Sequence, residues 1–462
     1  MTKINIKFFW VFAFLAFFFR WLFPGDISFQ MDEAQVLLDT LKSIENGLWI
    51  TKGPFGTRGL PIGPFPYYYY RVLLNITQDL HILILLHSTI LIGATVFGFS
   101  KILDIISPQN KRYALLLILA SPLFYHYSRM FWDNSLLIPL LSLTYGFYLS
   151  FDKDGAFKNL FLTFLFLSLA ANVHIMCLPV CVAIVGHILF YHRKRLLELW
   201  KPSIPGVLCL ILLNAPYAYE LYLSLSKIVK VNVDMKNNYI FPLRGPLAFT
   251  AYKLRYFLGG GYNYESGLPQ FFNYISRGLV FSLYLVFPIT ILGIVKKWKN
   301  DRISILFLIN LIVFYFQFIS SNNEDHPHYY NAVWIAHVFF FLKGIEYLSN
   351  RYEKIIQGIK YAHVTILFLM TLFFFQFVRH NHGSTRMHYG HRLDDLIKVT
   401  NLVSQHGKEN VKVELEQFQW EDIPTVLNRL YPVEKVLNEK ICIHNRNETK
   451  LKNHIHIEKC DF

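Results

Sequence analysis

Charged residues are scarce in this chain, and their scarcity excludes an ordinary soluble fold. Asp, Glu, Lys and Arg make up 16% of its 462 residues, against 53% hydrophobic and 17% aromatic residues. A soluble domain normally carries about 25% charged residues. The formal net charge is +14. This composition predicts a polytopic membrane protein whose basic surplus lies in cytoplasmic loops, and it gives no support to nucleic-acid binding.

Cysteine is scarce as well, with 5 residues in the whole chain. Cys177, Cys181 and Cys209 lie in apolar runs, where cysteine usually packs as a small buried residue. Cys442 and Cys460 lie in a polar tail, and a disulfide between them requires that tail to be outside the cell. The first apolar stretch has no small-residue cleavage site, so we expect a retained anchor rather than a removable signal peptide.

Long apolar runs predict about eleven transmembrane helices, each near the roughly 20 residues that cross a bilayer. Residues 159–192 are too many for one helix and contain Asn172, His174 and Pro179, which predicts a hairpin of two helices. The predicted segments are 6–24, 81–100, 112–128, 134–151, 159–175, 176–192, 203–222, 275–295, 302–320, 329–347 and 360–378.

Loop charges predict the orientation of these segments. Lys and Arg recur in every second loop, beginning with Lys3 and Lys7 before the first segment. The positive-inside rule therefore places the N-terminus in the cytoplasm and two long loops, 25–80 and 223–274, outside. A transmembrane domain would cover residues 1–380. The tail, 381–462, alternates like short strands at ICIHN and HIHIEK and predicts a small extracytoplasmic α/β domain.

A pair of carboxylates, Asp32 and Glu33, directly follows the first apolar segment. The pair has a structural explanation, in which Asp32 caps a helix and Gln35 reaches back to the start of that helix. Apolar residues at helical spacing support a helix here. They are Ala34, Leu37, Leu38, Leu41, Ile44 and Leu48.

Further polar residues fall on the same outer face of the predicted topology. Taken singly, Arg129 is explained as an interfacial anchor, Trp132 and the tetrad 67–70 as an aromatic belt, and His174 as a satisfied core histidine. Taken together they predict a water-accessible site at one membrane face, since a transporter would place ionisable groups near the bilayer midplane. The set comprises Lys52, Arg58, Arg129, Asp133, Asn172, His174, Tyr262, Tyr264, Glu265, Glu324, Asp325, His326, His328, Tyr329 and Tyr330.

Three sequence features, taken in their order along the chain, resemble those of a known family. The Asp-Glu pair, the Arg129–Asp133 turn and the stretch HPHYYNAVW before a late segment resemble the GT-C membrane glycosyltransferases, in the branch of the protein O-mannosyltransferases and the lipid A aminoarabinose transferases. The resemblance covers most of residues 1–380. The chain departs from the family at 331–334, where NAVW replaces a proline-containing apolar run.

The resemblance implies a multi-pass hexosyl or pentosyl transferase. Such enzymes take a sugar from a polyprenyl-phosphate carrier in the membrane and pass it, with inversion, to an acceptor hydroxyl of a protein, lipid or polysaccharide at the extracytoplasmic face. A polyprenyl-linked sugar flippase or a polysaccharide polymerase is the alternative, since both would share the carrier. The sequence identifies neither the sugar nor the acceptor.

The resemblance also implies roles for site residues. Asp32 would take the acceptor's proton, with Glu33 as its neighbour and possible substitute. A helix N-terminus would keep Asp32 ionised and so make it a weak base. Asp133 would position the acceptor, orient Arg129 or bind a divalent cation together with Asp32, and no cofactor is certain. Candidates for binding the donor are Arg129, Lys52, Arg58, His326, His328 and Tyr329.

Overall fold

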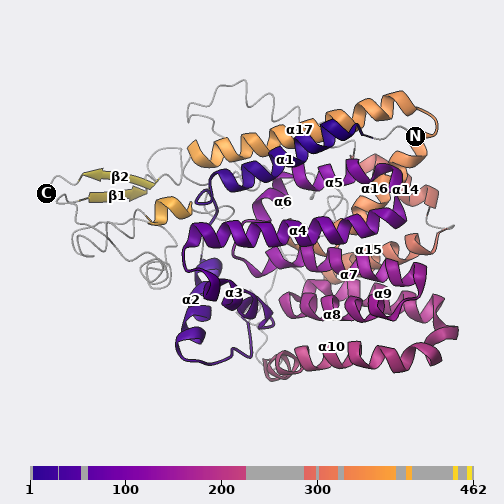
Figure 1. The fold of residues 1–462 in the computed structure, drawn as a ribbon, viewed down its shortest axis with the longest axis horizontal. Helices are drawn as coiled ribbons and strands as arrows, with labels where there is room; N and C mark the ends of the chain where they lie inside the picture. Colours follow the sequence, from indigo (N-terminus) through magenta and orange to yellow (C-terminus); the bar gives the residue numbers. More distant parts are fainter. Residues whose placement is uncertain are drawn as a thin grey trace.

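The computed structural model describes residues 4–29, 31–53, 61–224, 286–297, 301–320, 327–380, 392–397, 441–445 and 455–459. The chain forms a bundle of long helices (Figure 1). Each of the predicted apolar segments overlaps at least one helix. These helices are α1 (Ile6–Leu22), α4 (Leu80–Ile106), α5 (Lys111–Ala120), α6 (Pro122–Tyr127), α7 (Leu137–Asp154), α8 (Phe157–Val173), α9 (Leu178–Tyr191), α10 (Leu196–Ser224), α14 (Val286–Lys297), α15 (Arg302–Ser320), α16 (Trp334–Ser349) and α17 (Glu353–His380).

Four helical stretches of the described chain are long and apolar enough to cross a membrane, namely Leu80–Ile106, Asp133–Asp154, Ile204–Leu223 and Glu353–Gln376. Shorter apolar helices cover Phe157–Val173, Ile175–Tyr191 and Arg302–Gln317. Together these helices support an integral membrane protein. The total of about eleven crossings and their orientation remain predictions.

The predicted segment 112–128 is not one continuous helix. It is divided into α5 and α6 at Ser121, whose Oγ accepts a hydrogen bond from Phe124 N at 3.4 Å. Pro122 begins α6, because a proline has no N–H to continue the ladder of the preceding helix. The predicted hairpin in 159–192 is confirmed, since the chain turns at the short 3₁₀ helix η3 (Ile175–Cys177) between α8 and α9.

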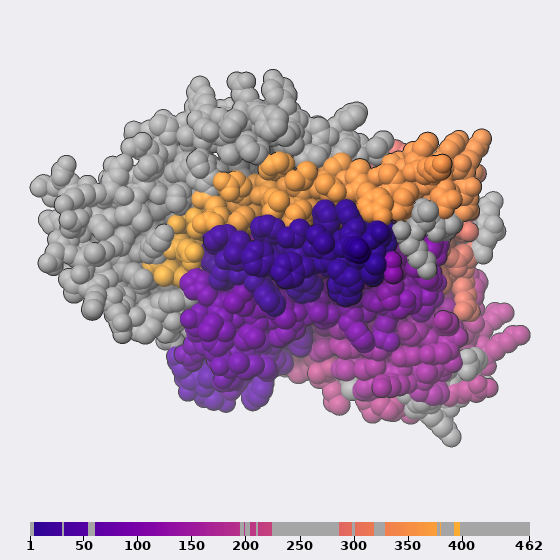
Figure 2. Space-filling model, turned by 45° about the horizontal axis from the view of Figure 1, so that its top comes forward, coloured from indigo at the N-terminus to yellow at the C-terminus, as the bar shows by residue number. Residues whose placement is uncertain are grey.

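Helices far apart in the sequence pack closely through small residues and aromatic rings. The glycines Gly98 of α4 and Gly146 of α7 let these helices touch, because a Cβ on Gly98 would lie 2.5 Å from the backbone carbon of Ser142. The first and last long helices, α1 and α17, lie side by side on one face (Figure 2), where the rings of Phe12 and Phe368 are 5.3 Å apart.

The predicted outer loop 25–80 contains two helices, α2 (Met31–Glu45) and α3 (Phe65–Ile76), at one end of the bundle (Figure 1). The predicted apolar stripe is buried, apart from Ile44, which is partly buried, and Leu48, which is 66% exposed beyond the end of α2. Residues of α2 and α3 form a second hydrophobic core with the start of α4 and with Phe131. Tyr67 and Tyr70 are buried in this core, so the aromatic-belt interpretation of these two residues is wrong.

The described part of the C-terminal region consists of a helical turn at 393–397 and an antiparallel hairpin of β1 (Ile441–Asn445) and β2 (Ile455–Lys459). The pairing joins the two stretches predicted as strands, with Cys442 opposite Glu458. Cys460, most of the tail and the predicted loop 223–274 lie outside the described residues, so the α/β domain remains a prediction.

Candidate active site

The first turn of α2 carries Asp32 and Glu33. The capping interpretation is wrong, because α2 begins at Met31 and Gln35 Nε2 donates to Asp39 Oδ2 at 2.7 Å instead of reaching back. Glu33 is 2% exposed, whereas the side chain of Asp32 reaches solvent. The protein around Asp32 nevertheless raises the pKa of its carboxyl group through desolvation. This direction is opposite to the one expected from the helix N-terminus.

Asp133 lies in the turn that leads into α7, at the start of the 3₁₀ helix η2 (Asp133–Leu136). It is 5% exposed, and its Oδ1 accepts a hydrogen bond from Asn134 Nδ2 at 3.2 Å. The negative charges of Asp32 and Asp133 repel one another. The structure thus brings together two carboxylates that lie in different outer segments of the sequence.

Two buried tyrosines of α3 help to hold this arrangement. The hydroxyl of Tyr67 donates to Asp39 Oδ2 at 3.2 Å, and the hydroxyl of Tyr70 donates to the main-chain oxygen of Trp132 at 3.3 Å. The first bond fixes α3 to α2, and the second fixes α3 to the turn before Asp133. The sequence analysis missed both roles, because only the periodic burial of one face of 65–76 distinguishes these tyrosines from an interfacial belt.

Arg129 is buried, which contradicts its interpretation as an interfacial anchor. It is 1% exposed, and its guanidinium donates to Tyr125 Oη at 2.7 Å, to Asp26 O at 3.4 Å and to Phe23 O. These bonds satisfy carbonyl groups after the end of α1. Arg129 is therefore a buried residue that holds the chain after α1, and it is not an interfacial anchor. Its role in phosphate binding remains a prediction.

The other predicted donor-binding residues are only partly described. Lys52 Nζ lies 3.8 Å from Glu220 Oε2 with its side chain 48% exposed. Arg58 and His326 lie outside the described residues, as do Tyr262, Tyr264, Glu265, Glu324 and Asp325. His328 belongs to the 3₁₀ helix η8 (Pro327–Ala332), but the description does not include its side chain.

Tyr329 and His174 lie near one another, with ring centroids 6.4 Å apart. His174 Nδ1 accepts a hydrogen bond from Met176 N at 3.0 Å, which caps η3 and agrees with a structural histidine. Asn172 also has structural partners, because its Oδ1 accepts from Phe65 N at 2.8 Å and its Nδ2 donates to Leu213 O at 2.9 Å. It thereby ties the start of α3 to α8 and α10.

The sequence analysis missed a cluster of ion pairs formed by Asp26, Arg379 and Arg392. Asp26, 2% exposed, lies 2.5 Å from Arg392 Nη2 and 3.3 Å from Arg379 Nε. Leu393 N donates to Ile27 O at 3.0 Å, so the segment 392–397 is held against the chain that leads into α2. No local pattern reveals these partners, because they come from opposite ends of the sequence.

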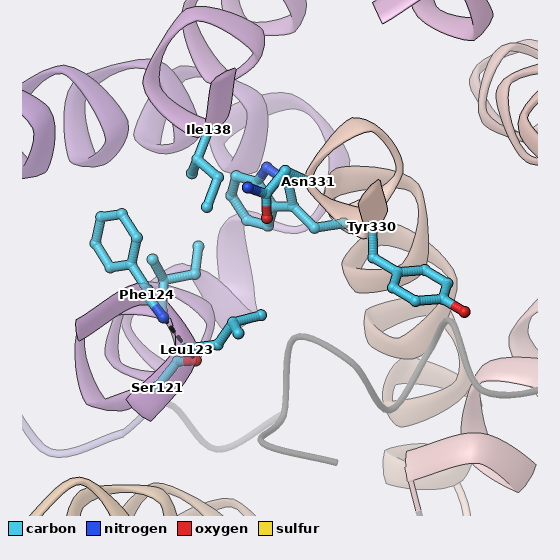
Figure 3. Close-up of a pocket in the computed structure, with 8 residues that line it drawn as sticks. Ser121, Leu123, Phe124, Ile138, Tyr330 and Asn331 are labelled. Atoms are coloured by element: carbon cyan, nitrogen blue, oxygen red, sulfur yellow. Dashed lines mark hydrogen bonds between the residues drawn. The ribbon is translucent and has the colours of Figure 1, made fainter. Parts of the chain in front are cut away.

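A small, mostly apolar pocket lies between α5–α6, α7 and the start of α16 (Figure 3). Asn331 at its edge donates from Nδ2 to Asn134 O at 3.4 Å, which places the pocket next to the turn that carries Asp133. The lining residues are Ile118, Ser121, Leu123, Phe124, Ile138, Tyr330, Asn331 and Trp334.

Comparisons with known proteins bear on the family and the fold. Residues 61–219 match the family model of the dolichyl-phosphate-mannose-protein mannosyltransferases. The fold is similar to that of ArnT from Cupriavidus metallidurans bound to undecaprenyl phosphate, with a TM-score of 0.54 and 12% identity over 96% of this chain and 86% of that chain. The apo state of the same protein gives a TM-score of 0.52 and 12% identity over 92% of this chain and 84% of that chain.

A search of curated proteins finds no match by sequence. The family match and the shared fold support a glycosyltransferase, and the sugar and acceptor are not established by them. The resemblance predicted from the sequence is therefore confirmed: the chain has the fold of the GT-C membrane glycosyltransferases and resembles the branch that holds the protein mannosyltransferases and ArnT.

Proposed function

We propose that the protein is an inverting glycosyltransferase that moves a hexosyl or pentosyl group from a polyprenyl-phosphate carrier to an acceptor hydroxyl at the extracytoplasmic membrane face. The observation that carries the proposal is the pairing of Asp32 with Asp133 at one end of a GT-C fold. The loop charges of the sequence support the extracytoplasmic side. The bound undecaprenyl phosphate of the similar ArnT structure supports a carrier of this class.

In the proposed reaction the acceptor oxygen attacks the anomeric carbon of the donor. The new carbon–oxygen bond forms as the bond to the carrier's phosphate oxygen breaks, and the carrier leaves as a phosphate anion. Asp32 takes the proton of the acceptor hydroxyl. Its raised pKa makes it a stronger base than an ordinary aspartate, provided that it remains ionised at the working pH.

Asp133 assists by its position. It lies within electrostatic reach of Asp32, where its carboxyl group can position the acceptor. The oxygen donors of both residues also fit a divalent cation of the Mg²⁺ or Mn²⁺ class. Such an ion, when bound, supplies positive charge to the leaving phosphate. Glu33 is the neighbouring carboxylate that could substitute for Asp32.

The apolar pocket beside the Asp133 turn offers a hydrophobic surface that the first isoprene units of the carrier could contact. Its lining is mostly hydrophobic, and Asn331 provides one polar group at its edge. Lys52, which is half exposed and lies 3.8 Å from Glu220 Oε2, is a candidate for binding the donor's phosphate. The tail, 381–462, would cover the acceptor's approach.

Transfer is tested by incubating the purified protein with radiolabelled polyprenyl-phosphate sugars and a cell-envelope extract. The proposal expects label in one acceptor class, with the anomeric configuration opposite to that of the donor. A product of retained configuration, or no transfer from any polyprenyl-phosphate sugar, would contradict it. Movement of intact donor across a vesicle membrane without transfer would favour a flippase.

A further inference from the structure

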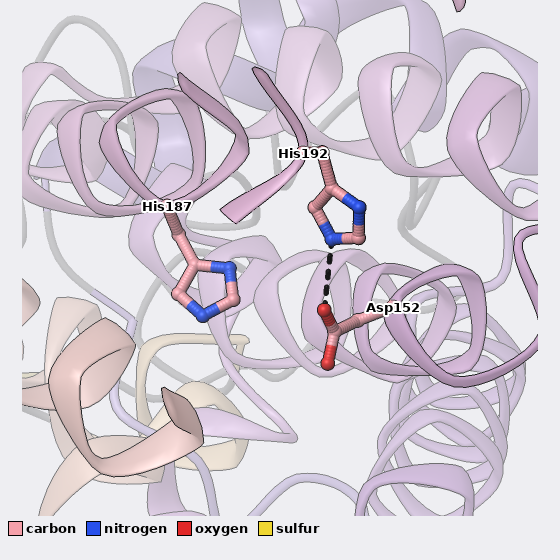
Figure 4. Close-up of side chains that lie close together, drawn as sticks. All are labelled: Asp152, His187 and His192. Carbon is pink, nitrogen blue, oxygen red and sulfur yellow. Dashed lines mark hydrogen bonds and ion pairs between the residues drawn. The ribbon is translucent and has the colours of Figure 1, made fainter. Parts of the chain in front are cut away.

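A second cluster of polar side chains lies at the opposite end of the bundle. Asp152 stands in the last turn of α7, and His187 and His192 come from the end of α9 (Figure 4). The helix α7 has 18 residues and is therefore about 27 Å long, which separates this cluster from Asp133. The three residues are 7%, 0% and 6% exposed, respectively.

The three side chains converge on one small volume. Each offers one ligand atom, and these atoms all lie within 4.8 Å of one another. Two ligand atoms of a tetrahedral zinc site are roughly 3.4 Å apart, because the bonds are about 2.0–2.1 Å long. A contraction of little more than 1 Å would therefore give a bound ion its normal geometry.

The hydrogen bonds of His187 fix the tautomer of its ring and leave one nitrogen unprotonated, so that a metal ion can bind this nitrogen by displacing a tyrosine hydroxyl. His187 Nε2 lies 3.1 Å from the main-chain oxygen of Arg302, which can only accept a hydrogen bond. Nε2 therefore carries the hydrogen, and Nδ1 of the neutral ring is unprotonated and receives the Tyr148 hydroxyl at 2.6 Å. An imidazole that binds a metal through one nitrogen and donates to a carbonyl through the other is the usual arrangement in metal sites.

The partners of Asp152 also favour metal binding. Its Oδ2 lies 3.0 Å from Arg302 Nη2, while its Oδ1 lies 2.9 Å from His192 Nε2. A metal ion can take the place of the single hydrogen between His192 Nε2 and Asp152 Oδ1, and that proton leaves to solvent. Arg302 would then remain on Oδ2 and hold the carboxylate in position.

We propose that Asp152, His187 and His192 form a binding site for a divalent transition metal of the Zn²⁺ class. Two imidazoles and one carboxylate are a donor set that suits zinc better than Mg²⁺ or Ca²⁺, which prefer oxygen ligands. Water occupies the fourth position. The bound ion joins α7 to α9 and, through Arg302, to α15, so it stabilises the end of the bundle that lies away from the proposed transfer site.

The test is zinc binding by tag-free protein in detergent micelles, measured by competition with a chromophoric chelator. Wild type should bind one Zn²⁺ per chain at this site. His187→Gln, His192→Gln and Asp152→Asn should each weaken that binding by at least about 100-fold, because loss of an outer partner alone commonly costs 10–100-fold. Zn²⁺ should raise the melting temperature of wild type and leave that of the three variants unchanged.

His363→Gln provides a matched control. His363 is also buried and also bonded to a tyrosine, with Nδ1 2.8 Å from Tyr113 Oη, but it does not belong to the cluster. This variant should bind Zn²⁺ as wild type does. Equal zinc affinity in wild type and the three cluster variants, or a melting temperature of wild type that Zn²⁺ does not change, would overturn the proposal and leave a hydrogen-bonded Asp–His–Arg network. Neither result depends on sugar transfer.

Discussion

Replacing Asp26 should destabilise the fold more than replacing one partner of an exposed ion pair does, because it removes the nearest carboxylate of the buried Arg392 and leaves Asp395 Oδ2 at 3.6 Å. Asp26 and Arg392 are both largely buried, with side chains 2% and 10% exposed. Breaking a buried pair typically costs about 3–5 kcal/mol, because it leaves a charge without a partner. Arg379, whose side chain is 41% exposed, adds little to this value. We therefore expect Asp26→Asn to lower the free energy of unfolding by about 3 kcal/mol.

The assay is denaturant unfolding in mixed micelles together with hydrogen exchange. The amides of Leu393 and Asp394 bond to Ile27 O and Gly25 O, so their exchange should accelerate when the pair is broken. Asp104→Asn is the control, because its pair with Lys111 at 2.7 Å is exposed and contributes under about 1 kcal/mol. Equal unfolding free energies for the two variants, with unchanged exchange at 393 and 394, would refute the role given to Asp26.

Three further predictions concern packing, pH and the tail. Gly98→Ala should destabilise the fold by about 1–3 kcal/mol in the same unfolding assay, because its Cβ would lie 2.5 Å from the backbone of α7. Gly93→Ala on the same helix is the control. Its Cβ would meet no described atom within 4 Å, so this variant should be neutral or slightly stabilising. Transfer should be lost as the pH falls through the raised pKa of Asp32, because the protonated carboxyl group cannot act as a base. The pH at which kcat/KM falls to half of its maximum should therefore lie above 3.8. If Cys442 and Cys460 are bridged as predicted, neither thiol should react with a maleimide before reduction.

Much of the helical bundle could be predicted from the sequence, because a membrane requires long apolar helices with satisfied backbones. The apolar stripe of α2 and the hairpin at 174–177 are further examples, since their patterns are local. The break between α5 and α6 was also marked locally by Pro122, although the run of apolar residues concealed it.

The site itself was only partly predictable. The family resemblance singled out Asp32 and Asp133, and the fold brings them together. The interfacial-anchor interpretation of Arg129 was wrong, because a lone arginine near a helix end can face the interface or satisfy carbonyl groups, and only tertiary contacts decide between them. The partnership of Asp26 with Arg392 was missed for a related reason, since nothing in either local sequence indicates the other.

The most direct test of the proposed function is the rate of sugar transfer by Asp32→Asn under single-turnover conditions. Loss of a general base should lower this rate by about 10²–10⁴-fold while the protein remains folded and binds the donor. Glu45→Gln is the control, because Glu45 is exposed in the last turn of the same helix. It should transfer sugar as wild type does. A transfer rate for Asp32→Asn equal to that of wild type would contradict a catalytic role for Asp32.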